Sequence, residues 1–197
     1  MGHTNHVLKK YNLKHSHGGS LRKLRKGRRF RPLSTRKPHH VVFKADKKAL
    51  KLNFRSPQTY KLVRRIIDRY AKRFFIKVEQ CSINFDHIHL NIRVPQRAMS
   101  HYFMRVVAGQ IAQELQKANL LREVTDTPAE KRGVTAKRVM KLWLLRPFTR
   151  VVHGWRGYAT LRNYIQLNEK EAAGVIPYQK TRLRGLSIVH WQKLWSS

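Results

Sequence analysis

Acidic residues are scarce in this chain of 197 residues, which has 10 Asp and Glu against 43 Lys and Arg. The formal net charge of +33 is far more than solubility requires, and it predicts a polyanionic partner. Apolar runs are also short, because none approaches the roughly 18 residues that a membrane span needs. The basic residues are spread along the whole chain, so nucleic acid is a better candidate partner than a membrane surface.

Cysteine is nearly absent as well. The single Cys81 cannot form an internal disulfide, and no signal peptide precedes the basic amino end. These features predict a protein of the reducing cytoplasm. The length of the chain predicts one compact domain with tails, because two full domains would leave little room for two cores.

The first carboxylate of the chain is Asp46, so the amino-terminal segment carries only positive charge. Such a segment cannot bury a core, and residues 1–38 are predicted to be a flexible basic arm that lies along DNA phosphates. The alternative is a solvated tail kept for solubility, although added acids would serve that purpose better. The residues predicted to bind DNA are Arg22, Lys23, Arg25, Lys26, Arg28, Arg29, Arg31, Arg36 and Lys37 in or beside the arm, together with Arg93.

From residue 39 the chain alternates between strand and helix patterns. Strands are expected at 40–46, 75–85, 86–94 and 141–152, and helices at 58–74, 99–115 and 154–174, the last closed by Gly174. In the first helix the apolar stripe is expected at Leu62, Ile66, Tyr70 and Phe74.

This order predicts an α+β domain over 39–174 with a ferredoxin-like βαββαβ antiparallel sheet. Two helices are expected on one face of the sheet, the other face is expected to be open, and a further helix follows at the carboxyl end. Residues 175–197 are predicted to be a basic tail. Trp191 and Trp195, four positions apart, indicate a short docking helix within it.

The stretch "FDHIHL", residues 85–90, carries the first candidate site. Strand alternation over 86–94 places His87, His89, Asn91 and Arg93 on the open face, and Asp86 on the opposite one. Two imidazoles two residues apart on a strand can bind one divalent ion, with a third ligand from another element. Taken alone, the pair is more typical of a solvated strand edge.

The stretch "YIQLN", residues 164–168, carries the second candidate site. On a helix Tyr164 and Asn168 lie one turn apart, so an amide oxygen could complete the metal site beside a phenol. A metal ion orients a phosphodiester for in-line attack, and the phenol could then act as the nucleophile. Tyr158 and Tyr102 are rival nucleophiles, but neither has a ligand-type residue four positions further on. The alternative for Tyr164 is a tyrosine at the rim of the core.

Together these features resemble the HUH endonuclease superfamily, and within it the single-tyrosine transposases of the small insertion-sequence type, especially the REP-associated tyrosine transposases. The segments that carry the resemblance lie within 31–176 and read "RPLSTRKPHHVVFKA", "FDHIHLNIRVP", "RPFTRVV" and "LRNYIQLNEKEAAG". The resemblance implies that His87, His89 and Asn168 bind a divalent metal, Mg²⁺ or Mn²⁺. It also implies that Tyr164 takes the 5′-phosphate of cleaved single-stranded DNA into a covalent phosphotyrosine.

The resemblance further implies DNA strand cleavage and rejoining beside hairpins formed by palindromic repeats, in the bacterial nucleoid, by a monomer or a homodimer. Glu169 and Glu171 depart from the usual pattern after the tyrosine and leave the third metal ligand open.

The competing hypothesis is a non-catalytic nucleic-acid-binding protein that uses the sheet as a platform. Stacking would require aromatic side chains on the open face, and the predicted face offers imidazoles, an amide and a guanidinium instead. Elsewhere, aromatic side chains that could stack on single-stranded bases are Trp143, Trp155, Trp191 and Trp195, although core packing is the better expectation for Trp143.

Overall fold

The computed structural model describes residues 15–21, 30–125 and 137–196. The strands are β1 (Ser16–His17), β2 (His39–Lys44), β3 (Lys77–Ile83), β4 (His87–Arg93), β5 (Glu123–Thr125), β6 (Lys137–Val139) and β7 (Phe148–Val151). The helices are α3 (Pro57–Arg73), α4 (Arg97–Lys117), α5 (Gly154–Ala172) and α6 (Ile188–Trp195), with short 3-10 turns η1 (Lys47–Ala49) and η2 (Arg182–Gly185). None of the helices in these described ranges is long and apolar enough to span a membrane.

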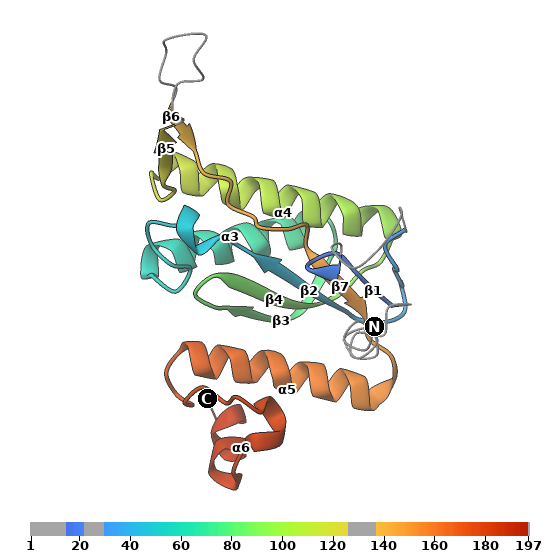
Figure 1. The fold of residues 1–197 in the computed structure, drawn as a ribbon. Helices are drawn as coiled ribbons and strands as arrows, with labels where there is room; N and C mark the ends of the chain where they lie inside the picture. Colours follow the sequence, from blue (N-terminus) through green and yellow to red (C-terminus); the bar gives the residue numbers. More distant parts are fainter. Residues whose placement is uncertain (1–14, 22–29, 126–136, 197) are drawn as a thin grey trace, which may run out of the picture.

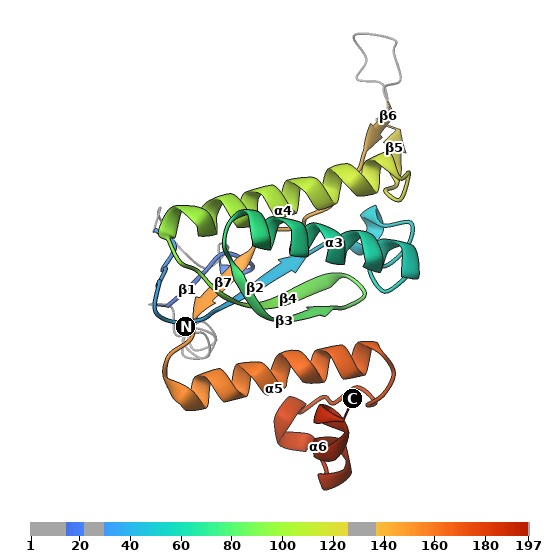
Figure 2. The same ribbon diagram turned by 180° about the vertical axis from the view of Figure 1, so that it is seen from behind.

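The main sheet has five strands in the order β1-β7-β2-β4-β3, and each neighbouring pair is antiparallel. Helices α3 and α4 cover one face, and α5 lies across the other (Figure 1, Figure 2). The predicted α+β class is confirmed. The face expected to be open is instead covered by α5, which contacts β3 and β4.

Strand β4 is an interior strand of the sheet, hydrogen-bonded to β2 on one side and to the edge strand β3 on the other. Its aliphatic residues Ile88, Leu90 and Ile92 are each 0% exposed and pack into the main core. This agrees with the alternation read from the sequence, because successive strand residues point to opposite faces. The histidine row of β4 therefore faces α5.

The predicted strand over 141–152 is shorter in the structure, where only Phe148–Val151 joins the sheet. Trp143 forms an isolated bridge with Ala45 and donates from Nε1 to the carbonyl of Ala108, 2.8 Å away. Its ring lies between Phe43 and Phe54, with centroid distances of 5.6 and 6.1 Å. Trp143 is therefore packed against the core, and the segment around it runs along the end of β2, with the Leu144 N–H donating to the carbonyl of Lys44 at 3.1 Å.

Part of the segment predicted as a flexible arm pairs with the sheet. Ser16 and His17 of β1 lie opposite Arg150 and Thr149 of β7. Arg31 donates from Nη1 to Thr149 Oγ1 at 2.9 Å and to the carbonyl of Pro147 at 3.2 Å. Burial, with a smaller contribution from the charge of Arg146, lowers the pKa of Arg31 to about 10. The predicted DNA-binding residues Arg22, Lys23, Arg25, Lys26, Arg28 and Arg29 lie outside the described residues.

The carboxyl end of the chain folds back onto α5. Gly174 adopts φ +76°, and the Val175 amide returns to the carbonyl of Lys170 at 2.9 Å, which ends the helix. Leu194 of α6 is buried with Leu167 and Ile176 in a small cluster. Helix α6 and turn η2 are thereby held against the outer side of α5 (Figure 1).

Candidate active site between the sheet and helix α5

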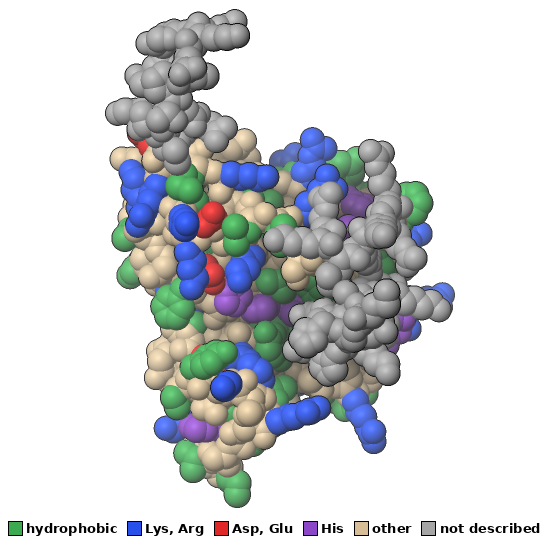
Figure 3. Space-filling view, viewed as in Figure 1, with side chains coloured by type: hydrophobic (Ala, Val, Ile, Leu, Met, Phe, Trp, Pro, Cys, Tyr) green, Lys and Arg blue, Asp and Glu red, His purple; other side chains and the backbone are tan. Residues whose placement is uncertain are grey.

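His87, His89 and Tyr164 come together where α5 crosses β4. The rings of His87 and His89 are perpendicular, with centroids 4.8 Å apart. The ring of Tyr164 stands edge-on to His89 at a centroid distance of 5.4 Å. His89 is only 5% exposed, whereas His87 is half-buried at the edge of the site. Histidine side chains reach the surface between the sheet and the α5–α6 layer, with Lys and Arg on both sides (Figure 3).

His40 of β2 is a further member of this cluster. Its Nε2 lies 3.0 Å from Nδ1 of His89, and the two rings stack with centroids 5.2 Å apart. Burial, and to a smaller extent the charge of Arg150, lowers the pKa of His40 to about 3. Burial also lowers the pKa of His89 well below its usual value, with help from His40, His87 and Arg182. Both rings are therefore neutral at pH 7, and one donates its single N–H to the other.

Asp86 holds the other histidine. Its Oδ1 lies 2.6 Å from Nδ1 of His87, and its side chain is largely buried. The prediction that Asp86 points to the opposite face is wrong, because Asp86 precedes the first residue of β4 and does not follow strand alternation. The carboxylate accepts from Nδ1–H of His87, which leaves the lone pair on Nε2.

Asn168 is buried one helical turn after Tyr164, as the spacing predicts. Its Nδ2 donates to the carbonyl of Tyr164 at 2.6 Å, so the amide oxygen is the end left to accept. Among the contacts of the described residues, none joins Asn168 to either histidine. Its role as a metal ligand stays a prediction.

The two carboxylates that compete with Asn168 for that role have arginine partners. Glu169 pairs with Arg55 at 2.6 Å and accepts from the backbone N–H of Ile83 at 3.3 Å. Glu171 pairs with Arg182 at 2.8 Å and accepts from the backbone N–H of Gln179 at 2.8 Å. These contacts satisfy both carboxylates within the protein, which favours the amide over either of them.

The donor atoms fit a divalent metal. His89 Nε2 is buried and has no hydrogen-bond partner among the described residues. Histidine binds a metal through one nitrogen of a neutral imidazole, usually while a neighbouring group forms a hydrogen bond with the other nitrogen. Here Asp86 contacts Nδ1 of His87, and His40 contacts Nδ1 of His89. In the described part of the chain no three His, Cys, Asp or Glu side chains form a metal-binding cluster. A third protein ligand would therefore be of another type, such as the Asn168 amide.

The rival tyrosines lie elsewhere. Tyr102 is on α4, on the opposite side of the sheet, and is 53% exposed. Tyr158 lies beside Arg93, whose guanidinium carbon is 5.9 Å from the ring centroid. Burial, followed by the negative charge of Glu79, raises the pKa of Tyr158 and disfavours its phenolate. Tyr164 is thus the candidate nucleophile that contacts the histidines.

The described residues predicted to bind DNA differ in their surroundings. Arg36 and Lys37 are exposed, and Lys37 Nζ lies 2.8 Å from Nδ1 of His153. Arg93 pairs with Glu79 at 2.6 Å, and Arg31 is bound to β7 as described above. Of these four described residues, Arg36 and Lys37 are the two with exposed side chains, and their DNA-binding role stays a prediction.

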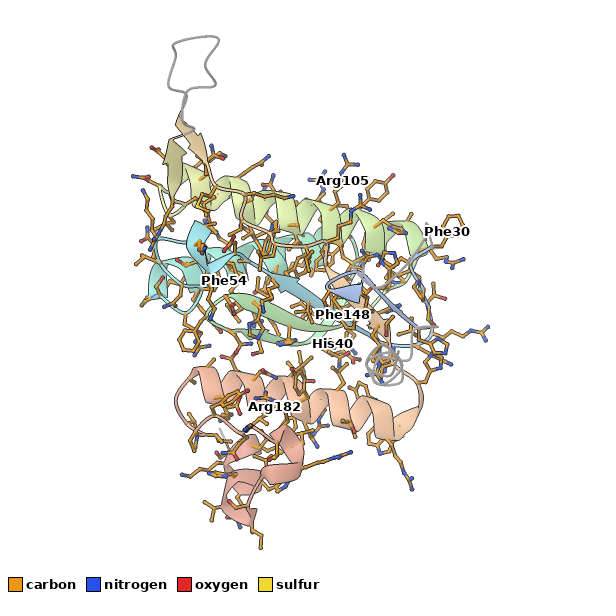
Figure 4. The ribbon with its side chains drawn as sticks, viewed as in Figure 1. Phe30, His40, Phe54, Arg105, Phe148 and Arg182 are labelled. Atoms are coloured by element: carbon orange, nitrogen blue, oxygen red, sulfur yellow. The ribbon has the colours of Figure 1, made fainter. Side chains whose placement is uncertain are left out.

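Sequence reasoning missed His40 and Arg182. His40 stands in the "HH" pair at the start of β2, but its role depends on the antiparallel neighbour that β2 acquires. Figure 4 shows His40 on the side of the sheet that faces α5, and Arg182 on the α5 side of the site. Arg182 comes from η2 in the carboxyl-terminal segment, where no local pattern marks it.

Comparisons with known proteins bear on the fold. No protein-family model and no curated protein matches the chain. Among solved structures, the chain is similar to a REP-associated tyrosine transposase bound to a REP hairpin, with a TM-score of 0.52 and 13% identity over 77% of this chain and 76% of that chain. It is also similar to a protein of Deinococcus radiodurans R1 named as a transposase, with a TM-score of 0.39 and 15% identity over 74% of this chain and 98% of that chain. The first match confirms, at the level of the fold, the resemblance found in the sequence.

Proposed function

We propose that this protein is a metal-dependent single-stranded DNA endonuclease and strand transferase that acts beside hairpins formed by palindromic repeats. One observation carries the proposal: Tyr164 of α5 lies edge-on to His89, beside His87 and beneath the sheet. The fold shared with a REP-associated tyrosine transposase supports it. The strand order β7-β2-β4-β3 also supports it. These strands are the fourth, first, third and second of the four strands predicted from the sequence, and this is the strand order of a ferredoxin-like sheet.

In the proposed reaction the phenolic oxygen of Tyr164 attacks the phosphorus of a DNA phosphodiester. A tyrosine O–P bond forms, the P–O3′ bond breaks, the phenol loses its proton and the leaving 3′-oxygen gains one. The product is a 5′-phosphotyrosine and a free 3′-hydroxyl. Attack by a 3′-hydroxyl on the same phosphorus reverses the step and rejoins or transfers the strand without an external energy source.

His87 and His89, with Asn168 as the proposed third ligand, would hold Mg²⁺ or Mn²⁺. When bound, such an ion neutralises charge on the phosphoryl oxygens and orients the phosphodiester for in-line attack. Asp86 and His40 fix the orientation of the two imidazoles, and the covering helix α5 limits access of water to His89.

The basic surface supplies binding. Arg36, Lys37 and the arm would neutralise phosphates of the hairpin stem, a contribution that positions DNA and weakens steeply with salt. Trp155, Trp191 and Trp195 are exposed and offer stacking surfaces for unpaired bases, whereas Trp143 is packed in the core. A non-catalytic protein that uses the open sheet as a platform is less well supported, because α5 covers that face.

The test is a covalent adduct between protein and DNA. The protein is incubated with Mn²⁺ and single-stranded hairpin oligonucleotides from repeats flanking its own gene, then run on a denaturing gel. We expect an adduct with the wild type and with Tyr158→Phe, and none with Tyr164→Phe or His87→Ala. Tight hairpin binding without an adduct under any divalent ion would contradict the proposal and leave a binding protein.

A further inference from the structure

Arg182 lies over the ring of the proposed nucleophile. Its guanidinium carbon is 5.2 Å from the ring centroid of Tyr164 and 5.5 Å from that of Tyr178. The residue therefore stands within the site, although it belongs to the segment that follows α5 (Figure 4).

The position of Arg182 is fixed from one side only. Its Nη1 pairs with Glu171 at 2.8 Å, and Glu171 also accepts from the backbone N–H of Gln179, which anchors the turn. Arg182 adopts φ +58°, a left-handed conformation that is unfavourable for a non-glycine residue. The segment is thus held in an unfavourable backbone conformation that places this side chain over Tyr164.

The other edge of the guanidinium has no partner. Nε and Nη2 are buried and form no hydrogen bond to any described residue. A buried N–H group without an acceptor lowers the stability of the protein, so two such groups on one side chain in a polar site call for an explanation. Nε–H and Nη2–H point in nearly parallel directions and form the fork with which arginine binds two oxygens of one phosphate.

We propose that Arg182 binds the phosphoryl group that Tyr164 attacks, through the fork of Nε–H and Nη2–H. This inference rests on the proposed function and adds a phosphate ligand from the carboxyl-terminal segment. The guanidinium would stabilise the negative charge that develops on the phosphoryl oxygens and would hold the resulting phosphotyrosine. Glu171 keeps the fork oriented and offsets the charge of the guanidinium before DNA binds.

The first experiment measures the rate of adduct formation at saturating hairpin DNA. Removing one preorganised donor group typically slows such a step by about 10²-fold or more, and we expect this for Arg182→Ala. Free guanidinium ion should restore much of the lost rate, which a purely structural role would not allow. Arg184→Ala is the matched control, because Arg184 is exposed in the same turn η2, and it should leave the rate unchanged.

Arg182→Lys guards against misfolding, because it keeps the charge beside Glu171 and lacks the fork. It should melt at the wild-type temperature and still form the adduct several times more slowly than the wild type. A wild-type rate in Arg182→Lys and Arg182→Ala would overturn the assignment of Arg182 and leave the proposed function intact.

The second experiment does not depend on cleavage. In the Tyr164→Phe background, we expect tighter binding of a 5′-phosphorylated oligonucleotide than of its unphosphorylated twin, and loss of that preference in the double variant with Arg182→Ala. If the wild type forms no adduct but this preference depends on Arg182, the proposed nuclease fails and the phosphate site stands. Equal affinities for the two oligonucleotides would overturn the phosphate site.

Discussion

Both faces of strand β4 are buried at the middle of the strand, but they are built from different chemistry. Ile88, Leu90 and Ile92 face α3 and α4 and are 0% exposed. On the other face Asn91 is also fully buried and His89 nearly so, and each has a buried polar atom without a partner among the described residues, Oδ1 and Nε2. Burying such atoms costs stability, whereas burying the aliphatic row contributes it.

The two faces of β4 therefore have different roles, because one contributes to the core and the other carries the candidate site. The aliphatic face belongs to a large core shared by sheet and helices, whereas the small cluster that α5 forms with the segment after β7 has Val152, Leu161 and Ile165 as its buried members. A protein keeps unpaired buried polar groups where function requires them and compensates for them elsewhere. Substitutions on the two faces should therefore separate stability from activity.

The largest effect is expected from His89→Leu. If His89 is a metal ligand as proposed, its loss removes several kcal/mol of transition-state stabilisation, so adduct formation should fall by roughly 10³-fold or more. The unfolding free energy should fall by no more than about 1 to 3 kcal/mol, the cost of leaving His40 Nε2 without its partner, because an apolar side chain of similar size fills the space and His89 Nε2 itself has no protein partner. Gel assays of the adduct and urea denaturation measure the two quantities. A large loss of stability combined with full activity would show that the His89 face of β4 serves the fold and not the reaction.

The complementary variant is Leu90→Ala, on the aliphatic face of the same strand. The cavity left in the core should lower the unfolding free energy by about 2 to 5 kcal/mol, measured by urea denaturation. The adduct rate per folded molecule should stay near that of the wild type, because Leu90 points away from α5. Ordinary stability combined with a strong loss of activity would show that the two faces are not independent.

Acidification should lower the stability of the protein through protonation of His39, which is buried on the aliphatic face of the sheet beside Val41. Burial lowers the pKa of His39 to about 4, and its Nε2 accepts from the Ser34 N–H at 3.0 Å, which requires the neutral ring. The unfolded chain, with a pKa near 6.5, therefore binds more protons between pH 6.5 and 4. Stability from this group is complete above pH 6.5 and is lost as the pH falls toward 4, by up to about 3 kcal/mol.

Urea denaturation of the wild type and His39→Gln across this pH range measures the contribution. The variant should lose less stability on acidification than the wild type. Identical pH profiles for the two proteins would show that His39 does not carry the effect.

Smaller effects are expected from the residues that orient the imidazoles. His40→Phe and Asp86→Asn keep the size of each side chain but weaken its contact with His89 or His87. Loss of such orienting contacts typically lowers metal affinity by about 10- to 100-fold, which Mn²⁺ titration calorimetry measures. Val41→Ala, on the aliphatic face of β2, is the control. Unchanged Mn²⁺ affinity in both variants would exclude an orienting role.

Local patterns predicted much of this structure. The alternation of residues 86–94 placed the histidines and the aliphatic residues on the faces where the structure has them, and helical spacing placed Tyr164 and Asn168 one turn apart. In α3 the helix was predicted, but its most deeply buried apolar residues are Val63 and Ile67. The predicted stripe repeats every four residues, which drifts around a helix of 3.6 residues per turn.

Contacts that depend on the tertiary fold could not be predicted in this way. Asp86 contacts His87 because the chain turns before β4 begins, outside the alternation. His40 meets His89 only because β2 pairs with β4 in a particular register. Arg182 reaches Tyr164 because the chain folds back after α5, where the Arg182 side chain forms an ion pair with Glu171.

The most direct measurement of the central claim is mass spectrometry of the protein–DNA adduct after nuclease and trypsin digestion. Cleavage after Arg162 and Lys170 yields a peptide whose one tyrosine is Tyr164. The account predicts that this peptide carries a nucleotide through a phosphate ester. A nucleotide attached to a peptide containing Tyr158 or Tyr102 instead, or DNA cleavage without any attached nucleotide, would contradict it.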